Sequence, residues 1–159
     1  MSDLPRVILD TNTLLRGFAN RDCASGQIIS LCERRNLLLL LSRPVIAEYR
    51  RVLGAAAILR RNPDITSANV ELVLRRLRYV GHFLAETNAH FDLARDRDDE
   101  PFVELAIDGS ATHLITNDND LLALASDHDD ATKRFRQRLH ALRVLRPEQF
   151  IREYRPKRL

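Results

Sequence analysis

The chain of 159 residues has few glycines and cysteines and no long hydrophobic run. Its five glycines form no glycine-rich phosphate loop, which argues against nucleotide-binding motifs built on such loops. Cys23 and Cys32 have no second pair and no histidine at zinc-ligand spacing, so we expect two buried or half-buried thiols rather than a zinc knot or redox pair. No apolar run is long enough to span a membrane, and the N-terminus lacks the pattern of a signal peptide. We therefore expect a cytoplasmic protein with no membrane partner.

The composition is that of a globular protein, with 45% hydrophobic and 30% charged residues. Its length predicts a single domain over residues 1–159. Charge is distributed unevenly, because residues 1–132 hold 15 basic and 20 acidic side chains, whereas residues 133–159 hold 10 and 2. The basic end is expected either to contact nucleic acid phosphates or to form solvated arginine-rich helix faces.

The stretch Val7–Asn12 is a short apolar run that ends in a carboxylate and two small polar residues. Such a run is typical of a buried strand in a parallel sheet, where ligands bind beyond the carboxyl ends of the strands. Asp10 stands at that end, either as a helix cap or as a functional carboxylate. Helical patterns over 13–19 and 26–35 precede a second apolar run, Leu37–Leu41, and this order predicts a right-handed parallel unit.

Further elements follow from apolar periodicity and from capping residues. Ser42 and Pro44 predict the start of a helix that ends near Leu53, and Thr66 or Ser67 caps an amphipathic helix that Gly81 ends. The remaining expectations are a connector over 54–64, strands over 82–86, 113–116 and 142–145, helices over 121–125, 133–139 and 147–154, and a loop over 127–130.

The run Asp96–Glu104 places four carboxylates in five positions before a helix with Pro101 in its first turn. Carboxylates this close repel one another, and a bound cation would offset that repulsion, so the run predicts either a site or a solvated acidic turn. The same helix carries acidic residues four positions apart, which we interpret mainly as an exposed surface stripe. These residues are Glu100, Glu104 and Asp108.

Acidic residues from four elements are expected at one edge of the parallel sheet. They are Asp10, Glu48, one of Asp96 to Asp99, and Asp118. Oxygen ligands of this kind suit Mg²⁺ or Mn²⁺, which can polarise a phosphodiester and lower the pKa of a bound water. Glu48 has an alternative as well, because Arg51 lies three residues away on the same helix.

With these motifs in order, nearly the whole chain resembles a PIN domain, the fold of many VapC-like ribonuclease toxins of prokaryotic toxin–antitoxin pairs. The resemblance rests on Val7–Asn12, Ser42–Glu48, Asp96–Glu104 and Leu114–Asp118. It implies a three-layer α/β/α sandwich around a parallel sheet of about five strands. Three positions depart from the family pattern, since Arg97, Glu100 and Asn117 stand where proline, asparagine and glycine are usual.

Carried over to this sequence, the family pattern implies four metal-binding carboxylates, namely Asp10, Glu48, Asp99 and Asp118. Asn12 and Thr116 would position them, and Asp96 would support the third motif. The third ligand is open among Asp96, Asp98, Asp99 and Glu104, and we favour Asp99 because it directly precedes the helix.

The resemblance implies a Mg²⁺- or Mn²⁺-dependent endoribonuclease that hydrolyses RNA by an activated water and leaves a 5′-phosphate. It further implies a homodimer, the toxin of a type II pair, inhibited by a cognate antitoxin protein. Arginine-rich segments are candidates for contacts with RNA phosphates, with solvated helix faces as the alternative. They are Arg50-Arg51, Arg75-Arg76-Arg78 and Lys133–Arg138.

Other functions fit the sequence less well. A haloacid-dehalogenase-like phosphatase also begins with a strand that ends in Asp, but it needs a second Asp where this chain has Asn12. It also needs a suitable lysine, as does a phosphoryl-accepting receiver domain, and this chain has only Lys133 and Lys157. A PIN-like scaffold that binds RNA or protein without cleavage remains the alternative.

Overall fold

The computed structural model describes residues 4–93, 96–126 and 128–154. Within these residues, five short strands form one parallel sheet in the order β3-β2-β1-β4-β5. The strands are β1 (Arg6–Leu9), β2 (Leu38–Ser42), β3 (His82–Leu84), β4 (His113–Ile115) and β5 (Arg143–Leu145). The central strands β1, β2 and β4 are almost entirely buried, as expected where helices cover both faces of a parallel sheet.

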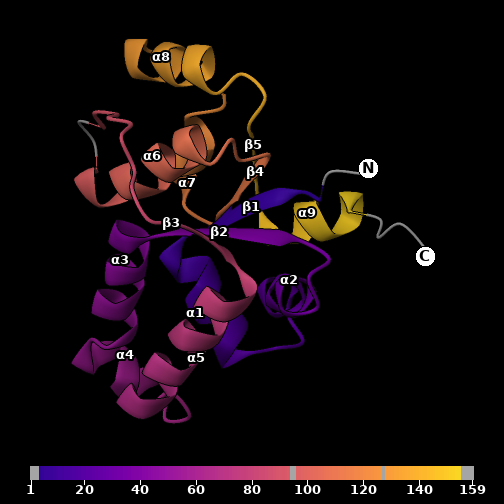
Figure 1. Ribbon diagram of the computed structural model, residues 1–159, viewed down its shortest axis with the longest axis vertical. Helices are drawn as coiled ribbons and strands as arrows, with labels where there is room; N and C mark the ends of the chain where they lie inside the picture. The colour runs from indigo at the N-terminus through magenta and orange to yellow at the C-terminus, as the bar shows by residue number, and fades with distance from the viewer. Residues whose placement is uncertain (1–3, 94–95, 127, 155–159) are drawn as a thin grey trace.

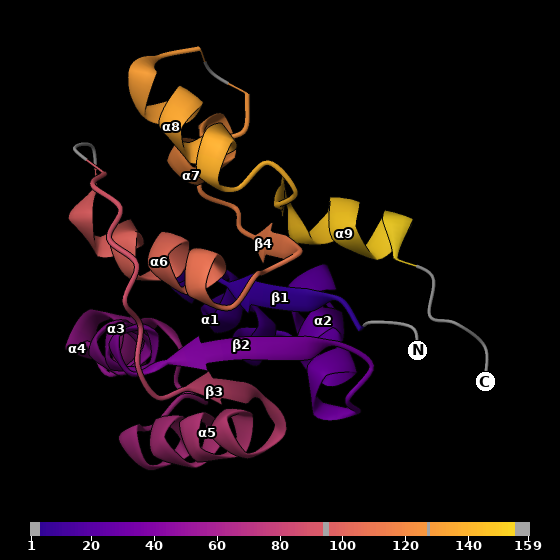
Figure 2. The same ribbon diagram turned by 45° about the horizontal axis from the view of Figure 1, so that its top comes forward.

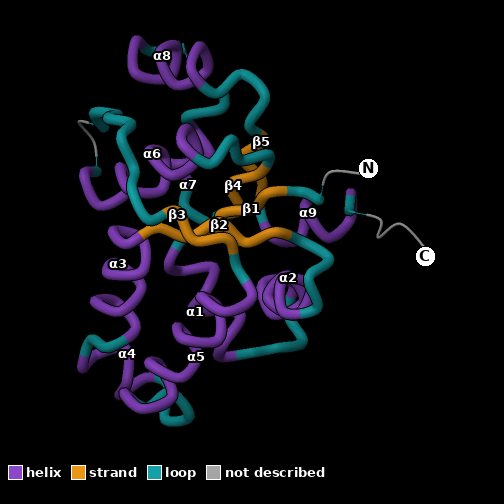
Figure 3. The backbone as a smooth tube through the Cα atoms, viewed as in Figure 1, coloured by secondary structure: helices purple, strands orange, loops and turns teal. Residues whose placement is uncertain are grey.

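Helices pack on both faces of this sheet, and Figure 3 shows the strands running between them. In Figure 1, α1, α2 and α5 lie below the sheet, and α6 and α7 lie above it. Figure 2 shows α8 packed on the side of α7, away from α5. The predicted fold class, an α/β/α sandwich around a parallel sheet, is therefore confirmed. The helices are α1 (Thr11–Ala19), α2 (Ala24–Glu33), α3 (Arg43–Leu53), α4 (Ala56–Arg61), α5 (Ser67–Val80), α6 (Glu100–Asp108), α7 (Asn119–Ala123), α8 (Asp130–Arg138) and α9 (Pro147–Glu153), with a single 3₁₀ turn, η1 (Arg97–Asp99), before α6.

The strand order changes direction between β1 and β4. From β1 the chain moves to β2 and β3 on one side, and it then returns to β4 and β5 on the other. Ligands of open parallel sheets bind outside the carboxyl ends of the strands at such a switch point. Asp10 directly follows β1 and Thr116 directly follows β4, so both predicted site residues lie at this position.

Local capping explains where several helices begin. The side chain of Ser42 accepts a hydrogen bond from the backbone N–H of Val45 at 3.3 Å, and Thr66 accepts one from Asn69 at 3.2 Å. The cap at Ser42 was predicted from the sequence, and the structure selects Thr66 over Ser67 for the other, because a side-chain oxygen at this position satisfies an otherwise unpaired N–H. These caps fix where α3 and α5 begin.

Several predicted boundaries are wrong. The helices predicted over 26–35, 121–125 and 133–139 begin earlier, at Ala24, Asn119 and Asp130. The interval 54–64 is not only a connector, because α4 forms over Ala56–Arg61. The run of alanine, isoleucine and leucine there consists largely of good helix formers, and the short helix needs no strong apolar periodicity. Helix α1 begins at Thr11, two residues earlier than predicted, because Asp10 itself caps it. The predicted loop over 127–130 includes Asp127, which lies outside the described residues.

The cysteines have the expected surroundings, with Cys23 half-buried, Cys32 buried and both thiols free. Burial raises the pKa of Cys32 to about 12, so this thiol remains protonated and unreactive. Among the described residues, every helix is too short or too polar to cross a bilayer.

Candidate functional site

Asp10 is a buried carboxylate with a defined orientation at the end of β1. Only 4% of its surface is exposed, and its Oδ1 accepts a hydrogen bond from the backbone N–H of Thr13 at 2.8 Å. Its other oxygen, Oδ2, accepts a short hydrogen bond from the hydroxyl of Thr116. Burial raises the pKa of Asp10, the bonds from Thr116 and Thr13 lower it, and the charge of Asp118 raises it again. Asp10 is therefore both a helix cap and part of a larger acidic group.

The hydroxyl of Thr116 connects the two strand ends. Besides donating to Asp10, its oxygen accepts a hydrogen bond from the backbone N–H of Asp118 at 2.9 Å. Thr116 is fully buried, and its own backbone N–H is bonded to Leu145 of β5 at 2.9 Å. One hydroxyl thus fixes the carboxylate after β1 relative to the turn after β4.

Asp118 caps α7, with its Oδ1 accepting a hydrogen bond from the backbone N–H of Asp120 at 2.8 Å. The Asp118 side chain is partly exposed, in contrast to that of Asp10. Its charge acts on both Asp10 and Asp99, since it contributes to the raised pKa of each. The carboxylates of these three residues therefore share one electrostatic environment.

Asp99 has the most strongly perturbed carboxylate of this group. Burial, and to a lesser extent neighbouring carboxylates, together raise its pKa from the ordinary value of 3.8 to about 7. In decreasing order, these neighbours are Asp96, Asp118, Asp10 and Asp120. Asp99 directly precedes α6 but makes no capping hydrogen bond. Its carboxylate is thus held among like charges rather than satisfied by the helix.

A small cavity lies beside Asp99. Its volume of about 20 Å³ is enough for about one water molecule. Three aspartates and three leucines contribute to its lining, which is largely apolar. The lining residues are Leu93, Asp96, Asp99, Asp120, Leu121 and Leu124.

Glu48 makes the ion pair that the sequence offered as its alternative. Its two carboxylate oxygens accept hydrogen bonds from Arg51 at 2.6 and 3.0 Å. Arg51 also lies 3.5 Å from Asp98, the exposed carboxylate of η1. Glu48 does not contribute to the raised pKa of Asp10 or Asp99, whereas Asp118 contributes to both. The structure thus brings Asp10, Asp99 and Asp118 together and leaves Glu48 paired with the guanidinium group of Arg51.

The supporting residues differ in their surroundings. Asn12 is exposed in the first turn of α1 and, within the described part of the chain, makes no side-chain hydrogen bond. Asp96 accepts a hydrogen bond from the backbone N–H of Asp98 at 2.9 Å and so shapes the turn that carries Asp99. Of the four candidates for the third position, Asp98 faces Arg51 and Glu104 is engaged with another segment, as described next.

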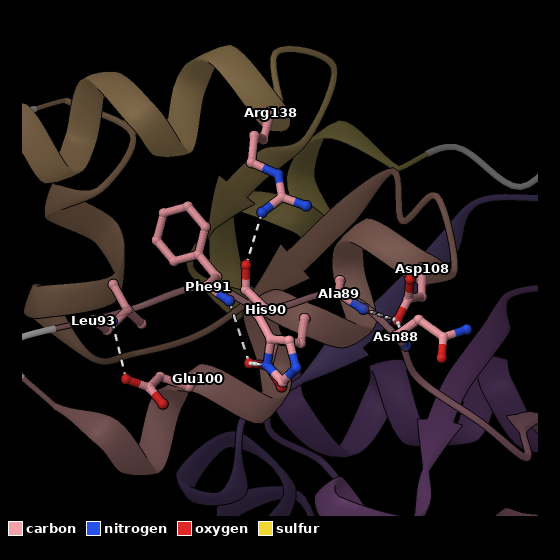
Figure 4. A network of polar contacts seen from close by, with 9 residues as sticks. Asn88, Ala89, His90, Phe91, Leu93, Glu100, Asp108 and Arg138 are labelled. Atoms are coloured by element: carbon pink, nitrogen blue, oxygen red, sulfur yellow. Dashed lines mark hydrogen bonds and ion pairs between the residues drawn. The ribbon is translucent and has the colours of Figure 1, made fainter.

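The acidic stripe of α6 is not the solvated surface that its spacing suggested, and this interpretation is wrong. Each of its carboxylates accepts backbone hydrogen bonds from residues 88–93, an extended segment that we call the strap (Figure 4). Asp108 binds the N–H groups of Asn88 and Ala89 at 2.8 and 3.0 Å. Glu104 binds that of Phe91 at 3.3 Å, and Glu100 binds that of Leu93 at 3.0 Å. The four-residue spacing therefore matches the donors of an extended chain, which the sequence pattern of α6 alone does not reveal.

The oxygen-only donor set fits a hard divalent cation. Asp10, Asp99 and Asp118 offer carboxylate oxygens, which Mg²⁺ and Mn²⁺ prefer, and a cation would relieve the repulsion that raises the pKa of Asp99. Within residues 4–93, 96–126 and 128–154, no group of three or more Asp, Glu, His or Cys side chains is arranged as a ready-made metal site. The donor atoms are therefore of the type that a divalent cation prefers, but these carboxylates are not arranged as a complete metal site.

The sequence alone did not single out two further residues of this region. The buried hydroxyl of Tyr49 on α3 donates a hydrogen bond to the backbone carbonyl of Leu9 at 2.5 Å, immediately before Asp10. Burial raises the pKa of Tyr49, so it stays a neutral donor. Asp120 lines the small cavity and acts on Asp99. The repeated Asn-Asp pattern of residues 117–120 could have indicated a role for Asp120. Tyr49 gave no such signal, because its position fits the apolar, core-facing side of α3.

Comparisons with known proteins agree with this fold. Residues 6–120 match the sequence profile described as "PIN domain", which covers β1 to the start of α7 and includes each carboxylate discussed above. The chain is also 25% identical over 153 residues to an uncharacterized protein of Methanocaldococcus jannaschii, covering 94% of this chain and 91% of the relative. PIN domains are generally nucleases, a class of hydrolases that acts on nucleic acid and typically uses divalent metals. The chain described here belongs to the PIN domain family.

Proposed function

We propose that this protein is a Mg²⁺- or Mn²⁺-dependent endoribonuclease and the toxin of a type II toxin–antitoxin pair. Asp10, Glu48, Asp99 and Asp118 are the proposed metal-binding and catalytic carboxylates. Asn12, Thr116 and Asp96 are the proposed positioning residues. Glu48 joins the other three by exchanging its ion pair with Arg51 for the cation.

The observation that carries the proposal is the shared environment of three carboxylates at the switch point of the sheet. Thr116 ties Asp10 to the turn of Asp118, and the charges of both aspartates raise the pKa of Asp99. Clustered, perturbed carboxylates at a ligand-binding edge are typical of functional sites, whereas structural carboxylates are normally paired with donors or cations.

The residues of the chain have separable roles in this proposal. Thr116 and the N–H of Thr13 hold the carboxylate of Asp10 in one orientation. Asp96 shapes the turn that presents Asp99, and Thr116 shapes the turn that presents Asp118. A bound divalent cation would supply charge stabilisation at the phosphodiester and a water of lowered pKa.

The experiment is a cleavage assay on RNA with Mn²⁺ or Mg²⁺, comparing the wild type with Asp10→Asn and Asp118→Asn. We expect a loss of more than about 100-fold in each variant, since residues that merely support metal ligands are already worth about 10- to 100-fold. Thr66→Ala, which removes a helix cap far along the chain, is the matched control and should cleave normally. Undiminished cleavage by both site variants would show that the assigned site is wrong.

The toxin role has its own tests. Expression of the wild type in a bacterial host should arrest growth, and expression of Asp10→Asn should not. A protein encoded beside this chain should bind it and restore growth, and the purified chain should elute as a homodimer in size-exclusion chromatography. Cleavage without growth arrest would retain the ribonuclease and reject the toxin.

A non-cleaving PIN-like scaffold is the second candidate. The ion pair between Glu48 and Arg51, together with the unassembled carboxylates, favours it. A protein that binds RNA but shows neither cleavage nor thermal stabilisation by Mn²⁺ would support this alternative.

A further inference from the structure

The basic segments of the chain are used in different ways. Arg50 is paired with Glu71 at 2.6 Å, and Arg51 is paired with Glu48. Arg76 lies 3.4 Å from Glu33 on α2. Arg75, Arg76 and Arg78 belong to the end of α5 that leads into β3, opposite the carboxyl edge of the sheet. Helix α8 is therefore the basic segment best placed to contribute cations beside the acidic site.

A cavity of about 260 Å³ lies between α8 and the strap. Arg134, Gln137 and Arg138 form its wall on α8, and His90, Phe91 and Asp92 form its wall on the strap. The strap and α8 are also joined by an edge-to-face contact of Phe91 with Phe135, whose ring centroids are 6.0 Å apart. The cavity is thus formed by two packed segments of the fold, with two guanidinium groups on the side of α8.

The position of Arg138 is fixed by a hydrogen bond to a neutral backbone carbonyl rather than by an ion pair with a carboxylate. Its Nη1 donates a hydrogen bond to the backbone carbonyl of His90 at 2.8 Å (Figure 4). A guanidinium has five N–H donors, so several remain for an anion. The imidazole of His90 is directed away from Arg138, and its Nδ1 lies 3.8 Å from Glu104. Arg134 is exposed and, among the described residues, has no ion-pair partner.

The cavity and the acidic site are joined by the strap. Asp92 lines the cavity beside α8, and the next residue, Leu93, lines the small cavity of Asp96, Asp99 and Asp120. The extended chain from His90 to Leu93 spans at most about 10 Å. A polyanion that enters the acidic site would be repelled by its carboxylates and attracted by the guanidinium groups next to it.

We propose that the cavity between α8 and the strap binds a backbone phosphate of single-stranded RNA that flanks the phosphate at the acidic site. Arg134 and Arg138 are the charged donors, and Gln137 is a neutral one. Arginine suits this task, because its planar donor fork matches phosphate oxygens in a bidentate manner. The inference rests on the proposed ribonuclease function for its choice of RNA, and it adds the subsite that orients the strand.

The test is equilibrium binding of a fluorescein-labelled oligouridine in EDTA over a series of salt concentrations. We expect Arg134→Ala to weaken binding about tenfold at low salt, as for the loss of one charged hydrogen bond. The slope of log K against log salt should become shallower by about 0.7, the value for one phosphate contact on a single strand. Arg138→Lys, which keeps the charge but not the donor fork, should have an intermediate affinity.

Lys133→Ala is the matched control, because Lys133 neighbours Arg134 on α8 but does not line the cavity. It should change affinity and slope less than Arg134→Ala. Equal effects of the two variants, or an unchanged slope in Arg134→Ala, would overturn the proposal. So would binding of polyglutamate that competes with the RNA and depends equally on Arg134, since that outcome assigns the cavity to acidic peptides.

This assay separates the inference from the ribonuclease proposal, because it requires no cleavage. If RNA binding depends on Arg134 but the protein never cleaves RNA, the proposed subsite is supported and the proposed nuclease function is rejected. Cleavage by a protein whose RNA binding ignores Arg134 would retain the nuclease and reject the subsite.

Discussion

Two groups of carboxylates begin within a few residues of each other on η1 and α6, and the fold treats them in opposite ways. Glu100, Glu104 and Asp108 each accept backbone hydrogen bonds from the strap. Asp99, one residue before Glu100, makes no capping bond and has a pKa raised to about 7 among other carboxylates. The partners, rather than the residue type, thus separate a structural carboxylate from a candidate functional one.

This difference has a physical basis. A carboxylate that accepts N–H bonds keeps its charge at little cost, because the donors replace the lost water. A half-buried carboxylate surrounded by like charges is destabilised in its charged form, and a cation or a proton relieves it. The stripe of α6 therefore stabilises the fold. The charged form of Asp99 is destabilised by its neighbours, and a bound ligand of opposite charge would remove that destabilisation.

The largest expected effect on stability comes from breaking the bridge at Thr116. Thr116→Val keeps the shape but removes the hydroxyl that donates to Asp10 and accepts from the N–H of Asp118. A buried oxygen of Asp10 and the half-buried N–H of Asp118 then lack a partner, so the free energy of unfolding should fall by about 2–3 kcal/mol. Urea denaturation measures it, with Thr116→Ser as the control that retains the hydroxyl. Equal stability of the two variants would mean that the bridge contributes nothing.

The pH dependence of stability sharpens the same comparison. An acid whose pKa is raised by folding binds more protons in the folded state between its two pKa values, so stability falls as pH rises through that window. For Asp99 the window runs from 3.8 to about 7. After allowance for solvent screening, the loss in metal-free protein should be about 2 kcal/mol.

Asp99→Asn removes this titration. In EDTA, the stability difference between Asp99→Asn and the wild type should therefore grow from pH 4 to pH 7 and then level off. Thermal denaturation across this range provides the measurement. A difference that is independent of pH would contradict the raised pKa of Asp99.

Removal of one strap contact should have a smaller effect. Asp108→Ala leaves the N–H groups of Asn88 and Ala89 without their acceptor. It also removes a negative charge from the C-terminal end of α6, where such a charge is unfavourable, so the net loss should be about 1 kcal/mol. Asp108→Asn keeps an oxygen acceptor and should be close to neutral. Hydrogen exchange should accelerate at Asn88 and Ala89 in the alanine variant alone, and unchanged exchange there would argue against the strap contact.

The smallest effect is expected for Arg51→Ala. Its ion pair with Glu48 is on the surface, and such pairs contribute little, so the unfolding midpoint should not change measurably. If Glu48 is a metal ligand, removal of its competing partner should tighten Mn²⁺ binding by at most about fivefold, measured by calorimetry. Arg50→Ala, which breaks the similar pair with Glu71, should leave Mn²⁺ affinity unchanged. Weaker Mn²⁺ binding by Arg51→Ala would instead indicate that Arg51 supports the site.

Much of the fold could be predicted because its information is local. The leucine run of β2, the caps at Ser42 and Thr66, and the apolar run before Asp10 each identify an element from a few adjacent residues. The helix over Ala56–Arg61 was missed because it lacks a strong amphipathic pattern. The strap was missed for a different reason, since its contact between Asn88 and Asp108 spans 20 residues and the acidic period of α6 does not identify its partner.

The sequence by itself determined the order of strands and helices and the places where carboxylates follow strand ends, because hydrophobic period and capping chemistry act between near neighbours. Only the tertiary structure decided which carboxylates face one another and which face donors. Asp10 accepts a hydrogen bond from Thr116, Glu48 is paired with Arg51, and the carboxylates of the α6 stripe accept hydrogen bonds from the strap. Hydrogen bonds and charges act over a few ångströms in space, so packing alone assigns their partners.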